Sequence, residues 1–588
     1  MASDFKTVLT KDPTIADITT DLVYAVKSGA SSTTYQPFPS TSATNSVQVF
    51  NIQVPSENII IGRDALIQCP LQFTLTISNV PINDVAIAWG QTASLQAFPL
   101  ASIMTTASAT INNSTVSVNL QDVLPMLLHL NSNRELYRYN GMCPSLPDQN
   151  WGSYVDAFGA SSSPLASYYN QSYDNDQAPR GAHPCYVQIN RYVANVFQDH
   201  SNVSTGVANE TWKVYVFTTV TEPIFLSPFI YADPEHNRQG MLGVNNMALT
   251  FNINSTLNRL VSVAKADAGA VYTISAGVGA DPDGGLWLAD SNLFRNAYAV
   301  PGIPTASSGG PTVLLKLLSS QPSDKLETRN VLPYFDLPRY LTSSANNANF
   351  PVGVERRVVS QSIQLSQLPD YFIVVARKPV TEQTITDTSS FLTIRSMSMN
   401  LNNQSGLLSS ASAQDLWRLS VKNGSQQTWS EFSGQAFVNS PDGEGGLVPT
   451  TGSVFIVSPT DLSLPDYLTA GSLGAFQLQF EASVYNQFNE VVNVELCVVA
   501  CNSGIFVLQQ GTANIYTGIL TREAVLASKK EEPMEEPDRM IGGKLLNRGM
   551  VRHPRHLGMK MASAPRAMGG AMSAGAMSAG RSRLSGMY

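Results

Sequence analysis

The sequence has little charge for its length. Charged residues make up 14% of the 588 residues, whereas about 25% is usual for soluble domains. Charged residues are depleted where protein surfaces are buried against each other. The composition therefore favours a protein that assembles with other copies over a secreted β-protein of similar composition.

Cysteines are few, odd in number and widely spaced. The five are Cys69, Cys143, Cys185, Cys497 and Cys501. This pattern argues against a disulfide framework and indicates a reducing compartment. Because Cys497 and Cys501 are four residues apart, they would share one face of a strand, and we expect them to be small buried side chains rather than metal ligands.

Long apolar runs are missing. The N-terminal residues MASDFKTVLTKD lack the apolar stretch of a signal peptide. The longest apolar runs are about six residues, 371–376 and 496–501, and a bilayer-spanning helix needs about 20. We therefore expect neither a secretory route nor a membrane span.

Motifs for catalysis or metal binding are also missing. The sequence has no Gly-x-Ser-x-Gly, no Walker-type phosphate loop and no His-Glu-x-x-His. Asp281 and Asp283 have the spacing that opens a calcium loop, but no acidic residue closes the loop at the required distance. We expect a protein that is not an enzyme, with no catalytic residue, cofactor or metal.

A local pattern occurs twice, at residues 107–124 and 396–416. Each copy has a strand, an Asn-Asn turn, a second strand and a Gln-Asp pair that opens a short helix. The matching pairs are Asn112-Asn113 with Asn402-Asn403, and Gln121-Asp122 with Gln414-Asp415. The repeat predicts two copies of one β-rich domain.

Strand signals recur along both halves of the chain. Alternating segments rich in β-branched and aromatic residues lie at 47–54, 66–77, 100–111, 186–193, 212–226, 247–254, 270–278 and 312–318, and then at 358–378, 391–401, 452–458, 476–485, 491–500 and 505–516. Helical spacing is limited to 120–130 and 412–421. We predict an all-β sandwich or jelly roll in each half, with one short helix per half.

The expected organisation has four parts: an extended N-terminal arm at 1–40, a first jelly roll at 41–320, a second at 321–525 and a low-complexity tail at 526–588. Tyr35, Phe38 and the two prolines beside them, Pro37 and Pro39, are expected to anchor the end of the arm. The long stretches at 131–185 and 279–310 are candidates for a tower on the capsid surface or for contacts between subunits.

The tail differs in charge from the rest of the chain. Residues 539–588 contain nine Lys or Arg and no Asp or Glu, although the whole chain has a net charge of −8. Three interpretations remain open: proteolytic removal, phosphate contact with nucleic acid, or no special role.

Proteolytic removal has a specific candidate site. Met540 and Gly542 precede Gly543 in an extended, slim sequence suited to a narrow protease cleft, so cleavage would fall between Gly543 and Lys544. Weaker cleavage candidates follow Gly570, Gly575 and Gly580.

Several motifs, in their order along the chain, resemble those of one viral family. They are YQPFPSTS (35–42), AFPLASIMTTASATIN (97–112), EPIFLSPF (222–229), MALTFNINSTLNRL (247–260), LPYFDLPRY (332–340), QLPDYFIVVARK (367–378) and VKNGSQQTWSEFSG (421–434). Over about 35–520, the chain resembles the major capsid proteins of virophages and Polinton-like viruses.

The resemblance implies a double jelly roll, two eight-stranded antiparallel sandwiches in one chain, with a flexible N-terminal arm and a disordered C-terminal tail. It implies homotrimers that form pseudo-hexagonal capsomers of an icosahedral shell around the genome. The implied partners are neighbouring capsomers, penton and minor capsid proteins, and a viral cysteine protease that cuts after an apolar-x-Gly-Gly site. The expected location is the virion, after assembly in the host cytoplasm or a viral factory. Because arms tie neighbours together and a basic segment favours packaged nucleic acid, we hypothesise that the arm and the tail face the capsid interior, where non-specific contact of the tail with viral nucleic acid is one of the open interpretations.

Two alternatives remain. A secreted or surface β-sandwich carbohydrate-binding protein would need a signal peptide, paired cysteines or a groove of carboxylates and aromatics, and the sequence offers none of these. A minor capsid or fibre protein is more often a single jelly roll, so the repeated motif argues against it.

Overall fold

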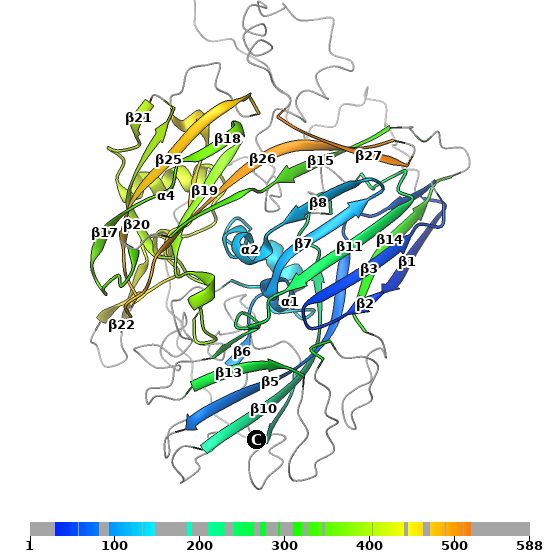
Figure 1. Ribbon diagram of the computed structural model, residues 1–588, viewed down its shortest axis with the longest axis horizontal. Helices are drawn as coiled ribbons and strands as arrows, with labels where there is room; N and C mark the ends of the chain where they lie inside the picture. The colour runs from blue at the N-terminus through cyan, green and yellow to red at the C-terminus, as the bar shows by residue number, and fades with distance from the viewer. Residues whose placement is uncertain are drawn as a thin grey trace, which may run out of the picture.

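Alternating apolar residues in the first half build two facing β-sheets (Figure 1). The computed structural model describes residues 30–56, 58–80, 93–131, 133–147, 185–190, 210–229, 239–263, 271–277, 292–294, 310–321, 326, 329–343, 347–387, 389–402, 404–439, 445–462, 471–488, 490–509 and 511–518. The strands of this first sandwich are β1 (Ser32–Pro39), β2 (Ser42–Ala43), β3 (Val47–Gln53), β4 (Ile59–Ile61), β5 (Leu66–Val80), β6 (Ala93–Leu95), β7 (Met104–Ile111), β8 (Ser114–Val118), β9 (Cys185–Asn190), β10 (Glu210–Pro223), β11 (Asn246–Ile253), β12 (Val261–Val263), β13 (Val271–Ala276) and β14 (Thr312–Ser319).

One sheet of the first sandwich has the order β1-β14-β5-β10-β9, with β13 paired to β5 and β4 to β14, and the other has the order β2-β3-β11-β7-β8. β6 and β12 form a separate pair. The inward residues of both main sheets share one core, which includes Phe50, Phe73, Phe251 and Val313. Burial of such side chains is the main force that holds two sheets together.

The second half repeats the arrangement. Its strands are β15 (Arg329–Asp336), β16 (Arg339–Ser343), β17 (Glu355–Val359), β18 (Ile363–Gln367), β19 (Tyr371–Arg377), β20 (Thr393–Leu401), β21 (Gln404–Leu407), β22 (Gln435–Asn439), β23 (Gly445–Pro449), β24 (Phe455–Val457), β25 (Leu473–Tyr485), β26 (Glu495–Gln509) and β27 (Thr512–Thr517). One sheet has the order β15-β26-β19-β24, with β16 and β27 paired to β26, and the other has the order β17-β25-β20-β21, with β18 paired to β25. β22 and β23 form a two-stranded sheet of their own. The prediction of an all-β fold with two sandwiches is confirmed.

The described residues contain more helices than the sequence predicted. They are α1 (Pro99–Ile103), α2 (Leu120–Leu128), α3 (Asn133–Leu136), α4 (Ala413–Lys422) and α5 (Trp429–Phe432), with 3₁₀ turns at Tyr137–Tyr139, Val380–Glu382 and Pro459–Leu462. The expectation of one short helix per half was wrong, because α1 and α5 are too short to show helical periodicity. None of the helices in this part of the chain is long and apolar enough to cross a membrane.

The repeated motif has the same geometry in both copies. Asn112, between β7 and β8, has φ 52°, and Asn402, between β20 and β21, has φ 51°. The N–H of each asparagine donates to a carbonyl of a neighbouring segment, Asn246 O at 2.9 Å and Gln477 O at 2.8 Å. Each side-chain oxygen accepts from the same region, from Asn245 N and Gln477 N. Asparagine suits this position because it tolerates the left-handed conformation and can bond locally.

One strand of the second half extends over the first sandwich. Residues 495–501 of β26 pair with β19, while residues 502–509 pair with β15. Leu332 of β15 and Phe506 of β26 belong to the core of the first sandwich. The sequence predicted two strands, 491–500 and 505–516, but β26 is one continuous strand across the top of Figure 1.

The end of the expected arm is extended and paired. β1 is antiparallel to β14, from Ser32 opposite Ser319 to Pro39 opposite Thr312. Phe38 packs against the first core, as expected for an anchor. Tyr35 is 74% exposed, so the prediction that it also anchors this segment was wrong. Residues 1–29 lie outside the described part of the chain.

Candidate functional site at the inter-sandwich interface

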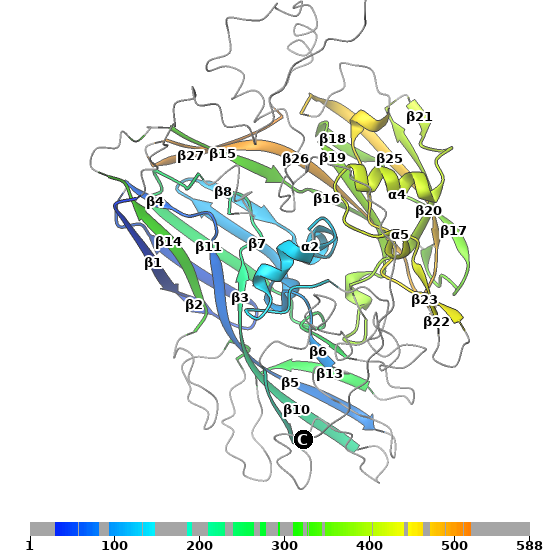
Figure 2. The ribbon, with the colours of Figure 1, turned by 180° about the vertical axis from the view of Figure 1, so that it is seen from behind.

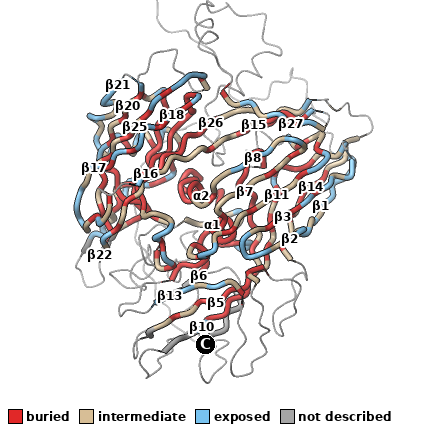
Figure 3. The backbone as a smooth tube through the Cα atoms, in the orientation of Figure 1, coloured by how far each residue is buried: buried red, intermediate tan, exposed pale blue. Residues whose placement is uncertain are grey.

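Helix α2 of the first sandwich lies between the two sandwiches (Figures 1 and 2). Val123, Met126 and Leu127 of α2 share a core cluster with Ile373 and Val499 of the second sandwich. We call the contact of α2 with β19 and β26 the inter-sandwich interface. It includes the ion pairs and hydrogen bonds between the two sandwiches that are described below. Figure 3 shows α2 buried along its course.

The interface explains the two longest apolar runs of the sequence. In β19, Phe372, Val374 and Ala376 face the core of the second sandwich, while Tyr371, Ile373 and Val375 face α2. β26 is divided in the same way, with Leu496, Val498 and Ala500 on one side and Cys497, Val499 and Cys501 on the other. A strand covered on both faces has a continuous apolar sequence instead of an alternating one. The predictions that Cys497 and Cys501 share a face and are buried are confirmed.

Proline inside α2 is compatible with this contact. Pro125 has no N–H, so the carbonyl of Gln121 loses its usual helical donor. Arg259 Nη1 donates to Gln121 O at 2.6 Å, and Arg259 Nη2 donates to Ser389 Oγ at 3.0 Å. One guanidinium therefore satisfies the helix and joins it to the second half.

A cluster of four charged side chains lies beside this apolar contact. Arg377 of β19 forms ion pairs with Asp122 of α2 and, at 2.9 Å, with Glu495 of β26. Arg339 Nε lies against the other carboxylate oxygen of Asp122 as an ion pair without hydrogen-bond geometry. The side chain of Arg377 is 3% exposed. The two positive and two negative charges balance. Buried charges are tolerated only when they are paired in this way.

The electrostatics of Arg377 follow from these partners. Burial opposes its positive charge, but the interactions with Cys497, Asp122 and Glu495 outweigh burial and leave the pKa of Arg377 above its ordinary value. The guanidinium therefore carries its charge in the folded chain at neutral pH. Removal of either carboxylate would leave a poorly compensated charge between the sandwiches.

Hydrogen bonds to backbone carbonyls extend the interface. Asn258 Nδ2 donates to Gln383 O at 2.8 Å, and Val263 N donates to Ile385 O at 2.9 Å. Gln426 N donates to His129 O at 2.9 Å, just after α2. Because these bonds join three separate residues of each half, they restrict rotation of one sandwich against the other.

A second contact involves β27 and the Asn-Asn turn of the first sandwich. Ala513 N donates to Asn113 Oδ1 at 2.7 Å, and Ser114 Oγ donates to Ala513 O. The second asparagine of the first turn therefore holds the strand that precedes the C-terminal tail.

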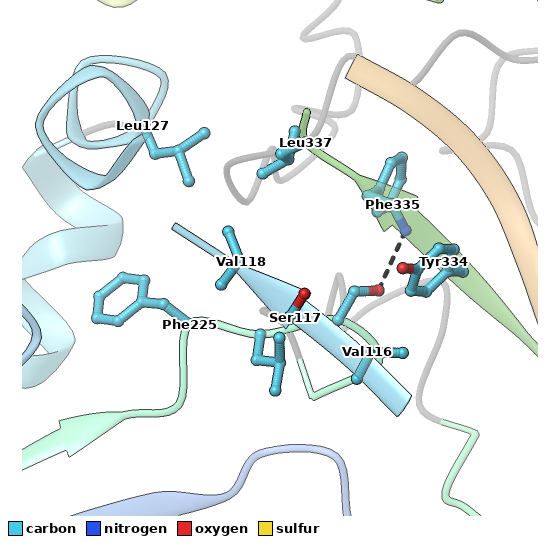
Figure 4. A pocket seen from close by; sticks show the side chains of 10 residues that line it. Val116, Ser117, Val118, Leu127, Phe225, Tyr334, Phe335 and Leu337 are labelled. Atoms are coloured by element: carbon cyan, nitrogen blue, oxygen red, sulfur yellow. Dashed lines mark hydrogen bonds between the residues drawn. The ribbon is translucent and has the colours of Figure 1, made fainter. Parts of the chain in front are cut away.

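A small apolar pocket lies between these two contacts (Figure 4). Val116 and Val118 of β8, Leu127 of α2 and Tyr334 of β15 are among its lining residues. On one side, Phe335 N donates to Ser227 Oγ at 3.1 Å. Its walls come from both halves, so the pocket belongs to the interface.

The sequence did not predict this interface. The available signal was the uninterrupted run of apolar residues in 371–376 and 496–501, which distinguishes strands with two covered faces from half-exposed strands. The predicted cleavage residues Met540, Gly542, Gly543 and Lys544, and the weaker candidates Gly570, Gly575 and Gly580, lie outside the described residues. Within the described ranges, no group of three or more His, Cys, Asp or Glu could hold a metal.

Comparisons with known proteins match both halves. A family model described as Sputnik virophage major capsid protein 1st domain matches residues 3–298. A second model, described as Major capsid protein V20 C-terminal domain, matches residues 337–504. Capsid protein V20 of Sputnik virophage is 28% identical over 548 residues, which is 90% of this chain and 82% of that protein.

Solved structures show the same fold. A chain of the Sputnik virophage structure has a TM-score of 0.72 at 24% identity, over 92% of this chain and 98% of that chain. The crystal structure of mavirus major capsid protein has a TM-score of 0.65 at 15% identity, over 91% of this chain and 100% of that chain.

The fold is a double jelly roll, which confirms the predicted fold class. The chain belongs to the Sputnik virophage major capsid protein family. It is a virion protein of the capsid, as the resemblance implied. The family consists of structural proteins rather than enzymes, in agreement with the expectation from the sequence.

Proposed function

We propose that three copies of the chain form a pseudo-hexagonal capsomer, and that these capsomers tile an icosahedral shell around the viral genome. The observation that carries the proposal is the inter-sandwich interface, where a buried helix and a balanced charge cluster hold two similar sandwiches together. A trimer of such a chain presents six similar sandwiches around one axis, which suits a six-sided block. For the bounds of the two jelly rolls we propose 41–320 and 321–525, and the pairing of β1 with β14 adds the end of the arm, Ser32–Pro39, to the first.

Mass and particle shape of the full-length chain test this proposal. Native mass spectrometry is expected to give a species near three times 63.4 kDa, and negative-stain microscopy is expected to show six-sided blocks or shells. A monomer at all concentrations would contradict the trimer. A monomer that binds a glycan would favour the carbohydrate-binding alternative, which the family matches do not support.

We further propose that a viral cysteine protease removes the tail after Gly543. Support comes from the sequence: Met540 and Gly542 precede the Gly543–Lys544 bond, and the two glycines before the bond carry no side chain. Co-expression with such a protease is expected to give a chain that ends at Gly543, measured by intact mass. Gly543→Val should block this product, whereas Gly570→Val should leave it unchanged. Cleavage after Gly570, Gly575 or Gly580 in the wild-type chain would contradict the assignment.

The basic tail suggests a location inside the shell until its removal. The nine positive groups of residues 539–588, a segment that contains no Asp or Glu, would release counterions from packaged nucleic acid. Binding of full-length chain to DNA should therefore weaken steeply with salt, compared with a chain that ends at residue 538. Protease added to intact particles should leave the tail uncut. In the shell, the other proposed partners are neighbouring capsomers, penton proteins and minor capsid proteins.

A further inference from the structure

A histidine at the end of α2 lies between the two halves of the chain. His129 follows Leu128, the last residue of α2, and its backbone oxygen accepts a hydrogen bond from Gln426 N of the second half at 2.9 Å. Its ring meets the ring of Phe391, also in the second half, edge to face, with the ring centres 6.0 Å apart. The residue is 5% exposed. We call this contact of His129 with Phe391 and Gln426 the His129 contact.

The histidine ring borders a small pocket that has walls from both halves. Leu124 of α2, Ser102 of α1, Arg259 and Ser389 line this pocket together with His129. Within the described part of the chain, the two ring nitrogens have no hydrogen-bond partner. The ring is therefore held by packing and not by hydrogen bonds.

The described residues around the ring provide no carboxylate for it. Arg259 is the one charged residue besides His129 among those that line the pocket, and α1 and residues 424–428 contain no titratable side chain. Asp122, near the other end of α2, is paired in the charge cluster, and Asp387 of the second half is also ion-paired. A protonated ring would therefore meet a positive group and no carboxylate in the described pocket wall.

The end of a helix ordinarily favours a positive charge, because its last carbonyls lack donors. The last carbonyls of α2 already have donors. Leu127 O accepts from Leu130 N and from Asn131 Nδ2, both at 3.0 Å, and Met126 O accepts from His129 N at 3.1 Å. The helix therefore offers a charged ring little compensation for its burial.

Burial opposes the charged form of the ring. It lowers the pKa of His129 from 6.5 to about 4. In a state where the ring reaches water, the proton binds near pH 6.5, whereas in the closed contact it binds near pH 4. Because the folded pKa is the lower one, the contribution of the closed contact is complete above pH 6.5 and falls as the pH drops to about 4.

We infer that the His129 contact is an acid-sensitive joint, which holds the two sandwiches together near neutral pH and is released when His129 takes up a proton. Opening exposes the end of α2 and residues 424–428, while the cores of the two sandwiches, which do not include His129, stay folded. The joint lies within one chain, so the inference is independent of the trimer proposed above. A shell built from such chains would loosen in an acidic compartment.

Hydrogen exchange of the full-length chain tests the joint. At pH 4.5, compared with pH 7 and corrected for the intrinsic rate, the amides of 129–131 and 424–428 should exchange about tenfold faster or more. The amides of β3 and β11, which pair within the first sandwich, should change by no more than about twofold. Equal acceleration of both sets, or no acceleration of either, would overturn the inference.

A variant that cannot be protonated gives the matched comparison. His129→Gln should lose the acceleration at 129–131 and 424–428, whereas His553→Gln, the same change in the basic tail, should behave as the wild-type chain. Acceleration that persists in His129→Gln would assign the acid response to another group and overturn the inference. If His129→Gln does not fold, the exchange pattern of the wild-type chain decides.

One nearby carboxylate needs its own control. Asp148 follows Pro147, which lines the pocket, but lies outside the described residues. Asp148→Asn should leave the acid response unchanged. An altered response would show that the protonated ring has a carboxylate partner, which contradicts the inference.

Discussion

Asp122 and Asp415 are the third residues of corresponding helices, α2 and α4, but they bond in different directions. Asp415 bonds back to Ser412 and closes a capping box at the start of its own helix. Asp122 makes no such bond with Asn119, which precedes α2, and pairs instead with Arg377 and Arg339. In the second copy of the motif the acidic residue therefore caps its own helix, whereas in the first copy it forms ion pairs with the second sandwich.

This difference makes Arg377 the residue whose loss should cost most. Arg377→Met leaves Asp122 and Glu495 close together without their shared cation, and the removal of one partner from a buried ion pair typically costs about 3–5 kcal/mol. A thermal unfolding curve of the full-length chain should show a large loss of Tm.

Two matched comparisons serve as controls: Arg357→Met against Arg377→Met, and Asp415→Asn against Asp122→Asn. Arg357→Met breaks a surface pair with Glu481, in which the arginine is 68% exposed, and exposed pairs contribute about 1 kcal/mol or less. Asp415→Asn should also cost less than Asp122→Asn, since it affects only a helix end at the surface. Equal losses for Arg377→Met and Arg357→Met would refute a stabilising role for the buried cluster.

The asparagine turns give a prediction about backbone strain. Asn402→Ala and Asn402→Gly both lose the bond from Gln477 N, but only alanine is strained at a φ of 51°. The alanine variant should be less stable than the glycine variant by about 1 kcal/mol. At Ser398, in the middle of β20, the order should reverse, because glycine is the worse residue within a strand. The same order at both positions would contradict a strained turn.

The sequence predicted much of the fold because local patterns carry it. Strands with one covered face alternate, as in 247–254, and the Asn-Asn turns require a residue that tolerates positive φ. The second helix was predicted at 412–421 and lies at 413–422, where Ser412 and Asp415 form the sequence signature of a capping box.

The inter-sandwich interface could not be predicted in the same way. Arg377, Asp122 and Glu495 are far apart in the chain, and only the fold brings them together. The sequence did not predict α1, because this helix has only five residues and no side chain caps its N-terminus. The strand that follows it determines the pattern of apolar residues in this stretch. β26 was divided into two strands because Asn502, Ser503 and Gly504 read as a turn in sequence, although they pair with β15.

The buried cysteines lead to a chemical prediction. Burial raises the pKa of Cys497 to about 12 and the pKa values of Cys69, Cys143 and Cys501 well above the ordinary value. The thiolate is the reactive form, so these four thiols should be inert in the folded chain at pH 8. A thiol-disulfide reagent should detect no more than one of the five cysteines quickly, and all five after denaturation. Fast reaction of two or more would contradict the placement of these side chains.

Glu222 gives a prediction about pH. Its fully buried carboxylate accepts hydrogen bonds from Leu100 N at 2.7 Å and Ala101 N at 2.9 Å, in the first turn of α1. Phe98, the residue before α1, provides no side-chain cap, so Glu222 of β10 satisfies these donors instead. Burial raises the pKa of Glu222 from 4.5 to about 8, although both backbone hydrogen bonds act to lower it.

A raised pKa means that the unfolded chain releases this proton at lower pH than the folded chain. The contribution of Glu222 to stability is therefore complete below pH 4.5, falls as the pH rises, and is lost by about pH 8. Glu222→Gln does not titrate, and it places an amide N–H against a backbone donor at a cost of about 1–3 kcal/mol. At pH 5 the wild-type chain should have the higher Tm, and this difference should shrink as the pH approaches 8. The surface variant Glu481→Gln should show little change with pH, and a difference for Glu222→Gln that stays constant or grows would show that Glu222 is already ionised in the folded chain.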